Sequence, residues 1–134
     1  MDFDVAIIGG GSAGYASAST AQSLGARVAI IDPGPLGGLC ILRGCMPTKT
    51  ILRSSDIMAL MRRAEEFGLQ PVDPHARLSA INDRKNKLIQ EFTDYRIQQL
   101  KDSRFTLIQE RAEFISPHEI RTGDQTLKAK SFIL

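Results

Sequence analysis

The run of three glycines at Gly9–Gly11 restricts the fold of this chain more than any other feature. It follows the apolar stretch Val5–Ile8, which has no polar alternation and is therefore typical of a strand covered on both faces. Ser12–Leu24 is rich in Ala and Ser and lacks Pro, and it predicts a tightly packed helix with Gly25 as its C-cap. Ala26–Asp32 predicts a second buried strand. Strand, helix and strand together predict a βαβ unit in a parallel sheet.

The glycines belong to a G-x-G-x-x-G pattern that runs from Gly9 to Gly14. In a dinucleotide site, Gly9 would allow the tight turn, Gly11 would leave room for the pyrophosphate, and Gly14 would let the helix pack closely on the sheet. Asp32 ends the next strand, near the offset expected for a carboxylate that binds the adenosine ribose. A glycine turn that binds nothing is the alternative, and the pattern alone does not separate NAD from FAD.

Both cysteines of the chain, Cys40 and Cys45, lie close together after this unit. A zinc site needs about four ligands at characteristic spacing, and only His75 and His118 remain as further soft ligands. Two buried, unpaired thiols are a second interpretation. A redox dithiol is the third, and the sequence favours it because a dinucleotide site nearby would provide electrons.

The spacing of the cysteines predicts an interruption between them. On one regular helix their Cα atoms would be roughly 8.5 Å apart, whereas a disulfide requires less than about 7 Å. Gly44 could provide a distorted turn, and Pro47 suits the first turn of a following helix. A thiol at that helix N-terminus would have a lowered pKa, which favours the reactive thiolate.

The remaining segments predict two long helices and then short strands. The helices are expected at Thr48–Phe67, closed by Gly68, and at Arg77–Lys101. The strands are expected at Arg104–Ile115, Glu119–Ala129 and Ser131–Leu134, with a turn at Gly123-Asp124. The last strand has no polar tail after it, so we expect these 134 residues to be part of a longer protein.

Composition excludes several classes of function. The net charge of +2 gives no strong field for nucleic acid or an anionic membrane. No apolar run reaches the length of a transmembrane helix, and the N-terminus lacks the basic start of a signal peptide. We therefore expect a cytoplasmic protein without nucleic-acid or membrane partners. In that compartment a close cysteine pair is typical of catalysis or metal binding rather than of a structural disulfide.

The segment GGLCILRGCMPTKTIL, Gly37–Leu52, resembles the active-site segment of class I pyridine nucleotide–disulfide oxidoreductases. This family includes dihydrolipoamide dehydrogenase, glutathione reductase and mercuric reductase. The resemblance implies an α/β fold: a Rossmann-like FAD-binding domain with a parallel sheet, a long helical pair and a small antiparallel β-meander. Residues 1–134 would be the N-terminal part of that domain, without the nicotinamide-binding and dimerisation domains.

The resemblance also implies roles for individual residues. Cys45 would be the thiol beside the flavin, Cys40 the interchange thiol that meets the substrate, and Lys49 a neighbour of the flavin N5. Asp32 would bind the adenosine ribose, and the backbone at Ala112 would contact the adenine. The other expected FAD contacts, including the pyrophosphate-binding loop, are Gly9, Gly11, Ser12, Ala13, Gly14, Gly38, Leu39 and Cys40.

The activity implied is two-electron transfer between NAD(P)H, FAD and the Cys40–Cys45 disulfide, most like that of dihydrolipoamide dehydrogenase. The substrate would be a small disulfide or dithiol, or a lipoyl group, and the full-length protein would be a homodimer. A mercuric or glutathione reductase-type enzyme is the alternative. The 134 residues alone would be inactive, and a dinucleotide-binding module without turnover is a further alternative.

Overall fold

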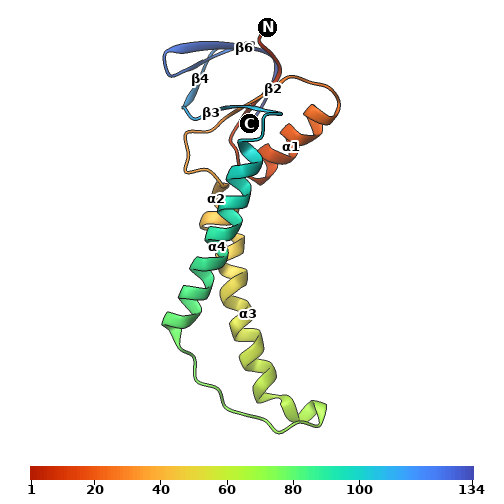
Figure 1. The fold of residues 1–134 in the computed structure, drawn as a ribbon, viewed down its shortest axis with the longest axis vertical. Helices are drawn as coiled ribbons and strands as arrows, with labels where there is room; N and C mark the ends of the chain where they lie inside the picture. Colours follow the sequence, from red (N-terminus) through yellow and green to blue (C-terminus); the bar gives the residue numbers. More distant parts are fainter.

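Six strands form the head of the molecule in the computed structural model, which describes residues 1–134 (Figure 1). They are β1 (Phe3–Ile8), β2 (Val28–Ile31), β3 (Thr106–Ile108), β4 (Ala112–Ser116), β5 (Glu119–Thr122) and β6 (Gln125–Ile133). Their order in the sheet is β3-β2-β1-β6-β5-β4. The first four in that order run parallel, and β5 and β4 are antiparallel to their neighbours. The predicted parallel sheet with an antiparallel meander is therefore confirmed.

The predicted βαβ unit comprises β1, the helix α1 (Ser12–Ser23) and β2. The two strands pair in parallel register from Val5 with Val28 to Ile8 with Ile31. All four residues of β2 are buried, as their continuous apolar run predicts. Helix α1 ends at Ser23 with Leu24 as its C-cap, one residue earlier than predicted. The chain then leaves the helix through Gly25, whose φ of 84° few other residues adopt, so the predicted role of Gly25 in ending the helix is confirmed.

Side chains alternate between the two faces of the parallel strands, and each face has its own core. One cluster contains Ile7 and Ile30 and packs against Ala18 of α1 and a leucine of the second long helix. The other contains Ala6 and Ile31, together with residues of the meander. The full clusters are Ile7, Ala18, Val28, Ile30, Leu36, Leu100 and Phe105 on one face, and Ala6, Ala29, Ile31, Ile120, Leu127 and Ala129 on the other.

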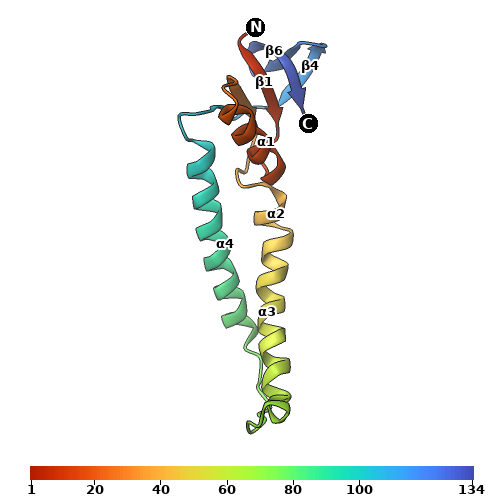
Figure 2. The same cartoon turned by 90° about the vertical axis from the view of Figure 1, so that its right-hand side faces the viewer.

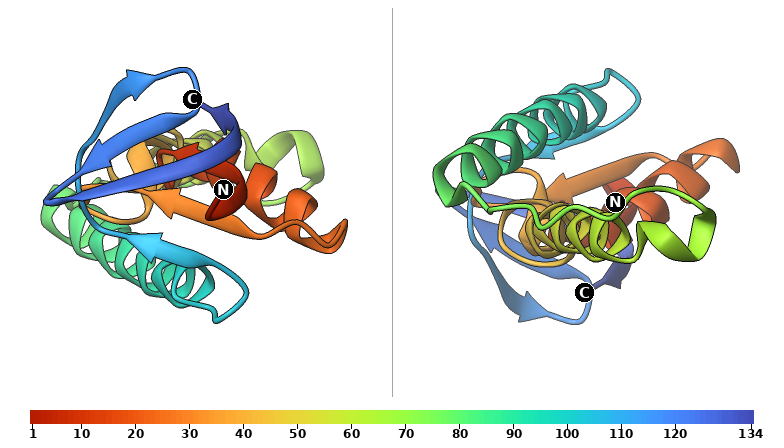
Figure 3. Two further views of the ribbon diagram at one scale, coloured as in Figure 1. Left: turned by 90° about the horizontal axis from the view of Figure 1, so that it is seen from above. Right: turned by 90° about the horizontal axis from the view of Figure 1, so that it is seen from below.

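A long helical hairpin projects from the head (Figures 1 and 2). It begins with the short α2 (Gly38–Leu42), continues through α3 (Cys45–Arg62) and the 3-10 turn η1 (Ala64–Phe67), and returns along α4 (Leu78–Leu100). The end-on views show α3 and α4 next to each other (Figure 3). In α3 no residue is buried, and in α4 only Leu100 is. No helix of the structure combines the length and the apolarity needed to span a bilayer.

The prediction of one helix over Thr48–Phe67 was wrong at both ends. Helix α3 starts earlier, at Cys45, so that Pro47 lies in its first turn. Proline is tolerated there because it lacks an N–H and the N–H groups of the first turn have no acceptor within the helix. It ends at Arg62, and the next residues form the separate turn η1. Gly68 closes that turn in the left-handed region, at a φ of 72°, as predicted.

The three predicted C-terminal strands are divided differently in the structure. Arg104–Ile115 forms two strands, because the chain crosses from β3 at one edge of the sheet to β4 at the other. Glu119–Ala129 is interrupted at Gly123, where the predicted turn is confirmed. The second half of that segment and Ser131–Leu134 belong to one strand, β6, which pairs with β1 on one side and β5 on the other.

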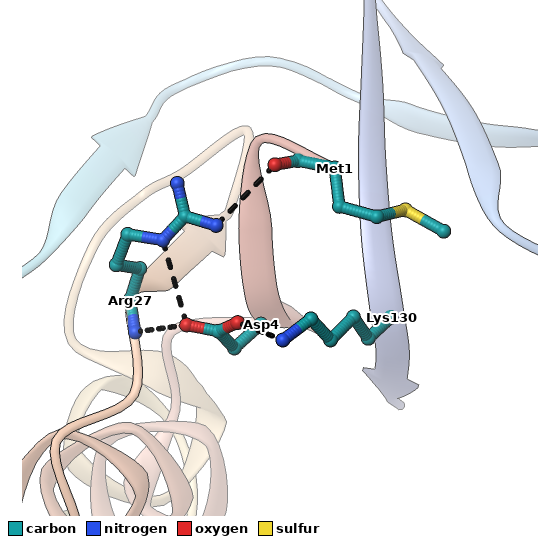
Figure 4. Close-up of polar contacts among 4 residues, drawn as sticks. All are labelled: Met1, Asp4, Arg27 and Lys130. Atoms are coloured by element: carbon teal, nitrogen blue, oxygen red, sulfur yellow. Dashed lines mark hydrogen bonds and ion pairs between the residues drawn. The ribbon is translucent and has the colours of Figure 1, made fainter.

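A cluster of ion pairs holds three parts of the sheet together at the amino ends of its parallel strands (Figure 4). The Asp4 carboxylate of β1 lies 2.7 Å from Lys130 Nζ of β6. Its other oxygen accepts a hydrogen bond of 2.9 Å from the Arg27 backbone N–H, just before β2. The Arg27 guanidinium also donates to the carbonyl oxygen of Met1. These contacts leave the opposite, carboxyl ends of the strands free for the loops that form the site.

Candidate functional site

The glycine loop between β1 and α1 turns at the carboxyl end of β1. Gly9 has a φ of 112°, which requires glycine. A Cβ on Gly14 would lie 1.8 Å from the Gly9 carbonyl oxygen, so this position requires glycine for packing. A Cβ on Gly11 would lie 3.9 Å from the nearest protein atom, the Gly38 Cα, whereas a Cβ on Gly38 would lie only 2.6 Å from the Gly11 Cα. The protein therefore does not fill the space that a side chain on Gly11 would occupy, and a bound pyrophosphate would need this space.

The N-terminus of α1 is also suited to a bound phosphate. Gly11 is its N-cap, no side chain caps the helix, and its first turn contains no acidic residue. The first backbone N–H groups of an α-helix have no acceptor within the helix, and together with the helix dipole they favour an anion. The residues Gly11, Ser12, Ala13 and Gly14 therefore fit a phosphate group.

Asp32 follows β2 and lies beside the glycine loop. Its carboxylate accepts hydrogen bonds from the backbone N–H of Gly10, at 2.6 Å, and of Gly34, at 2.7 Å. The side chain thus joins the loop after β1 to the loop after β2. Each carboxylate oxygen can accept more than one hydrogen bond, so these contacts leave room for a ribose hydroxyl.

The two cysteines lie on either side of the helix interruption that their spacing predicts. Cys40 belongs to α2, which ends at Leu42, and Cys45 is the first residue of α3. A Cβ on Gly44 would lie 3.1 Å from the Leu39 carbonyl oxygen and 3.3 Å from the Cys40 Cα. This close approach explains why glycine occupies the turn, and it brings the second cysteine back toward the first.

The two thiols have different acidities. A hydrogen bond with Cys40 lowers the pKa of Cys45, and the positive charge of Lys49 lowers it further. The same hydrogen bond raises the pKa of Cys40, because ionising Cys40 would remove the donor that stabilises the Cys45 thiolate. Cys45 is therefore the more acidic thiol of the pair and Cys40 the less acidic one.

A cleft of about 490 Å³, here called the glycine cleft, brings the glycine loop and the cysteine turn together. Its lining includes residues from the loop, the turn and the end of β6: Gly9, Gly11, Ser12, Ala13, Gly14, Leu39, Cys40, Gly44, Cys45, Ile133 and Leu134. The predicted site residues Asp32, Gly38, Lys49 and Ala112 lie outside this lining. Of these, Gly38 contacts Gly11, and Ala112 is the first residue of β4.

A second hollow of about 240 Å³ lies on the α4 side of Cys40. We call it the Arg96 hollow, and its lining is Ser12, Cys40, Ile41, Met46, Phe92, Tyr95 and Arg96. Cys40 and Ser12 line both cavities, whereas Cys45 lines only the glycine cleft. The aromatic residues and the arginine come from α4, and no sequence motif marked them.

Neither cavity has a His, Asp or Glu side chain beside the thiols. No cluster of three or more His, Cys, Asp or Glu side chains suitable for a metal ion occurs in the structure. His75 lies in the segment before α4, and His118 lies in the turn between β4 and β5. Neither histidine lines the glycine cleft or the Arg96 hollow.

Comparison with known proteins agrees with this geometry. The sequence pattern of the family "Pyridine nucleotide-disulphide oxidoreductase" matches residues 3–134. The chain belongs to this family. Its members depend on FAD and NAD(P) and reduce disulfide substrates, so the predicted family is confirmed.

The relatives divide between two activities. A mercuric reductase of Staphylococcus aureus is 34% identical over 134 residues, which are 99% of this chain and 24% of that protein. A dihydrolipoyl dehydrogenase of Chlamydia muridarum is 33% identical over 135 residues, 98% of this chain and 29% of that protein. The chain thus spans about a quarter of the length of these relatives.

A solved structure has the same arrangement of elements. It is the Cu(II) complex of the HOCl-induced flavoprotein disulfide reductase RclA from Escherichia coli. The match has a TM-score of 0.74 and 27% sequence identity, and it covers 96% of this chain and 26% of that one. The 134 residues therefore have the fold of the N-terminal region of a flavoprotein reductase.

Proposed function

We propose that this chain is the FAD-binding, dithiol-bearing part of an enzyme that transfers two electrons between NAD(P)H and a disulfide substrate. The position of Cys40 between the two cavities is the observation that carries the proposal. A cysteine pair that exchanges electrons with a cofactor on one side and a substrate on the other needs one thiol that faces each side, and only Cys40 lines the second cavity. Cys45, which lines only the glycine cleft, is then the thiol on the cofactor side.

Some of the residues proposed to hold FAD line the glycine cleft, and the others lie outside its lining. Gly9, Gly11, Ser12, Ala13 and Gly14 would bind the pyrophosphate, because their backbone is uncapped and unobstructed. When bound, FAD supplies a two-electron carrier. The remaining proposed contacts are Asp32 with the ribose, Gly38, Leu39 and Cys40 along the cofactor, Lys49 near the flavin ring and Ala112 near the adenine.

The cysteines themselves account for the substrate half-reaction. The Cys40 sulfur attacks one sulfur of the substrate disulfide, forming a mixed disulfide and releasing one thiolate that takes up a proton. The Cys45 thiolate then attacks the Cys40 sulfur, forming the Cys40–Cys45 disulfide and releasing the second substrate thiol. The substrate gains two electrons and the pair loses two. Oxidation of a dithiol substrate is the reverse sequence.

Cys40 needs a base for this reaction, since its pKa is raised by its hydrogen bond with Cys45. No His, Asp or Glu lines either cavity. We propose that the base, the nicotinamide site and the homodimer contacts belong to domains outside these 134 residues, and that the enzyme works in the cytoplasm.

Two substrate classes agree with the relatives. A dihydrolipoyl-type dithiol or a similar small disulfide is our first candidate, because thiol–disulfide exchange needs only the pair described above. Mercuric ion is the second, favoured by the 34% identity to a mercuric reductase and by the two soft sulfur ligands of the cysteine pair.

Titration of the purified chain with FAD, followed by quenching of flavin fluorescence, tests the cofactor assignment. We expect saturable binding that Gly11→Val abolishes, because the added side chain would occupy the pyrophosphate space and not a protein contact. Gly68→Ala, at the far end of the hairpin, is the matched control and should bind as the unmodified chain does. A folded chain that takes up no FAD would contradict the assignment.

A further inference from the structure

We propose that the Arg96 hollow binds an anionic group of the substrate, so that the enzyme acts on disulfides that carry a carboxylate close to the sulfur atoms. This inference rests on the proposed function, in which Cys40 is the thiol that meets the substrate. It concerns Arg96, a residue of α4 to which neither the glycine motif nor the cysteine motif gives a role.

Arg96 is unlike every other arginine of the chain. It is the only arginine that is not exposed. Its Nε and Nη1 atoms are buried and have no hydrogen-bond partner. Arginines elsewhere pair with carboxylates, as Arg27 does with Asp4 and Arg121 with Glu113, or else lie exposed in water. A shielded charge without an acceptor is costly, so its retention points to a partner outside these 134 residues.

The aromatic neighbour of Arg96 does not replace such a partner. Its guanidinium lies 4.4 Å above the centre of the Tyr15 ring, a cation–π contact that holds the group in place. The ring face accepts no strong hydrogen bond from the guanidinium N–H groups. Tyr15 therefore orients the guanidinium without supplying the acceptor that Nε and Nη1 lack.

The rest of the hollow suits a small apolar chain that ends in an anion. Phe92 and Tyr95 are exposed aromatic residues on its α4 side, and Ile41 and Met46 line it from the cysteine segment. The lining has no acidic side chain, so Arg96 gives it a net positive charge. Cys40 lies in the same lining, which places the reactive sulfur and the anion site in one cavity.

Two disulfides that differ only in charge test this inference. The reduced chain is mixed with 3,3′-dithiodipropionic acid or with its neutral diamide, and the loss of free thiols is followed with time. The rate ratio of acid to diamide is divided by the same ratio for dithiothreitol, which corrects for intrinsic reactivity. We expect a corrected ratio of about ten, as for a charge-assisted hydrogen bond, and a decrease in high salt.

Substitutions identify the charge that is responsible. Arg96→Gln should lower the corrected ratio about tenfold. Arg96→Lys should retain most of the preference for the acid because the positive charge remains. Arg43→Gln is the matched control, since Arg43 is exposed near Cys45 and lines neither cavity. It should leave the ratio within about twofold of the unmodified chain.

A corrected ratio near one in the unmodified chain would overturn the inference without any variant. So would an unchanged ratio in Arg96→Gln with an intact far-ultraviolet circular dichroism spectrum. Rapid oxidation of the pair by the diamide alone would overturn the acidic substrate class and leave the proposed function standing. If neither reagent oxidises the pair in this chain, the inference is overturned, whereas the proposed function is tested separately by the binding of FAD.

Discussion

The two ends of the parallel strands use polar groups in opposite ways. At the amino ends, Asp4 pairs with Lys130 and with Arg27, so that the charges hold strands together. At the carboxyl ends, the N-terminus of α1 has no capping side chain and Arg96 has no acceptor. A buried polar group that the fold does not pair, such as the Arg96 guanidinium, is costly unless a ligand pairs it, and the exposed N–H groups of α1 are open to an anion. The contrast separates the part of the sheet that provides stability from the part that provides a site.

The largest expected effect distinguishes two glycines within the same loop. Gly14→Ala should destabilise the chain by more than about 3 kcal/mol, because the new Cβ would overlap the Gly9 carbonyl oxygen. Gly11→Ala should cost less than about 1 kcal/mol, since its Cβ would enter open space. Urea unfolding followed by circular dichroism measures both. Equal losses of stability would mean that packing, and not a ligand, requires both glycines.

The second prediction concerns the two thiols. Alkylation of Cys45 by iodoacetamide should begin at a lower pH than that of Cys40, because their mutual hydrogen bond lowers the pKa of the first and raises that of the second. Cys45→Ser should lower the pKa of Cys40, and Cys40→Ala should raise that of Cys45. Mass spectrometry of the labelled peptides across a pH series gives each profile. Coinciding profiles would remove the asymmetry on which their roles depend.

The third prediction has the smallest effect and concerns the amino end. The hydrogen bond with Lys130 and that from the Arg27 backbone lower the pKa of Asp4 from 3.8 to about 2. Because the folded pKa is the lower one, the contribution of Asp4 to stability is complete above pH 3.8 and is lost as the pH falls toward about 2. Thermal melts across this range should show a steeper loss for the unmodified chain than for Asp4→Asn.

Asp124→Asn provides the control for that experiment. Asp124 is an exposed carboxylate in the turn between β5 and β6 and takes part in no ion pair. Its replacement should leave the acid-dependent loss of stability unchanged. If Asp4→Asn and Asp124→Asn behave alike, the cluster in Figure 4 contributes nothing specific to the sheet.

The parts of the site that are local in sequence could be predicted, and those assembled by distant segments could not. The glycine loop, the βαβ unit and the interruption at Gly44 follow from short-range sterics, which residue types and spacing express directly. Arg96 reaches Cys40 only because the α3–α4 hairpin returns to the head at the right length. Likewise, the end of β6 joins the cleft through pairing with β1.

Absorbance of the reduced chain during titration with FAD tests the central claim most directly. If the glycine cleft holds the cofactor with Cys45 beside its ring, a long-wavelength thiolate–flavin band should grow to saturation. The band should disappear in Cys45→Ser and persist in Cys40→Ala, at a higher pH because the Cys45 pKa is then less depressed. Bound flavin with the same band in Cys45→Ser would contradict the assignment of the two thiols.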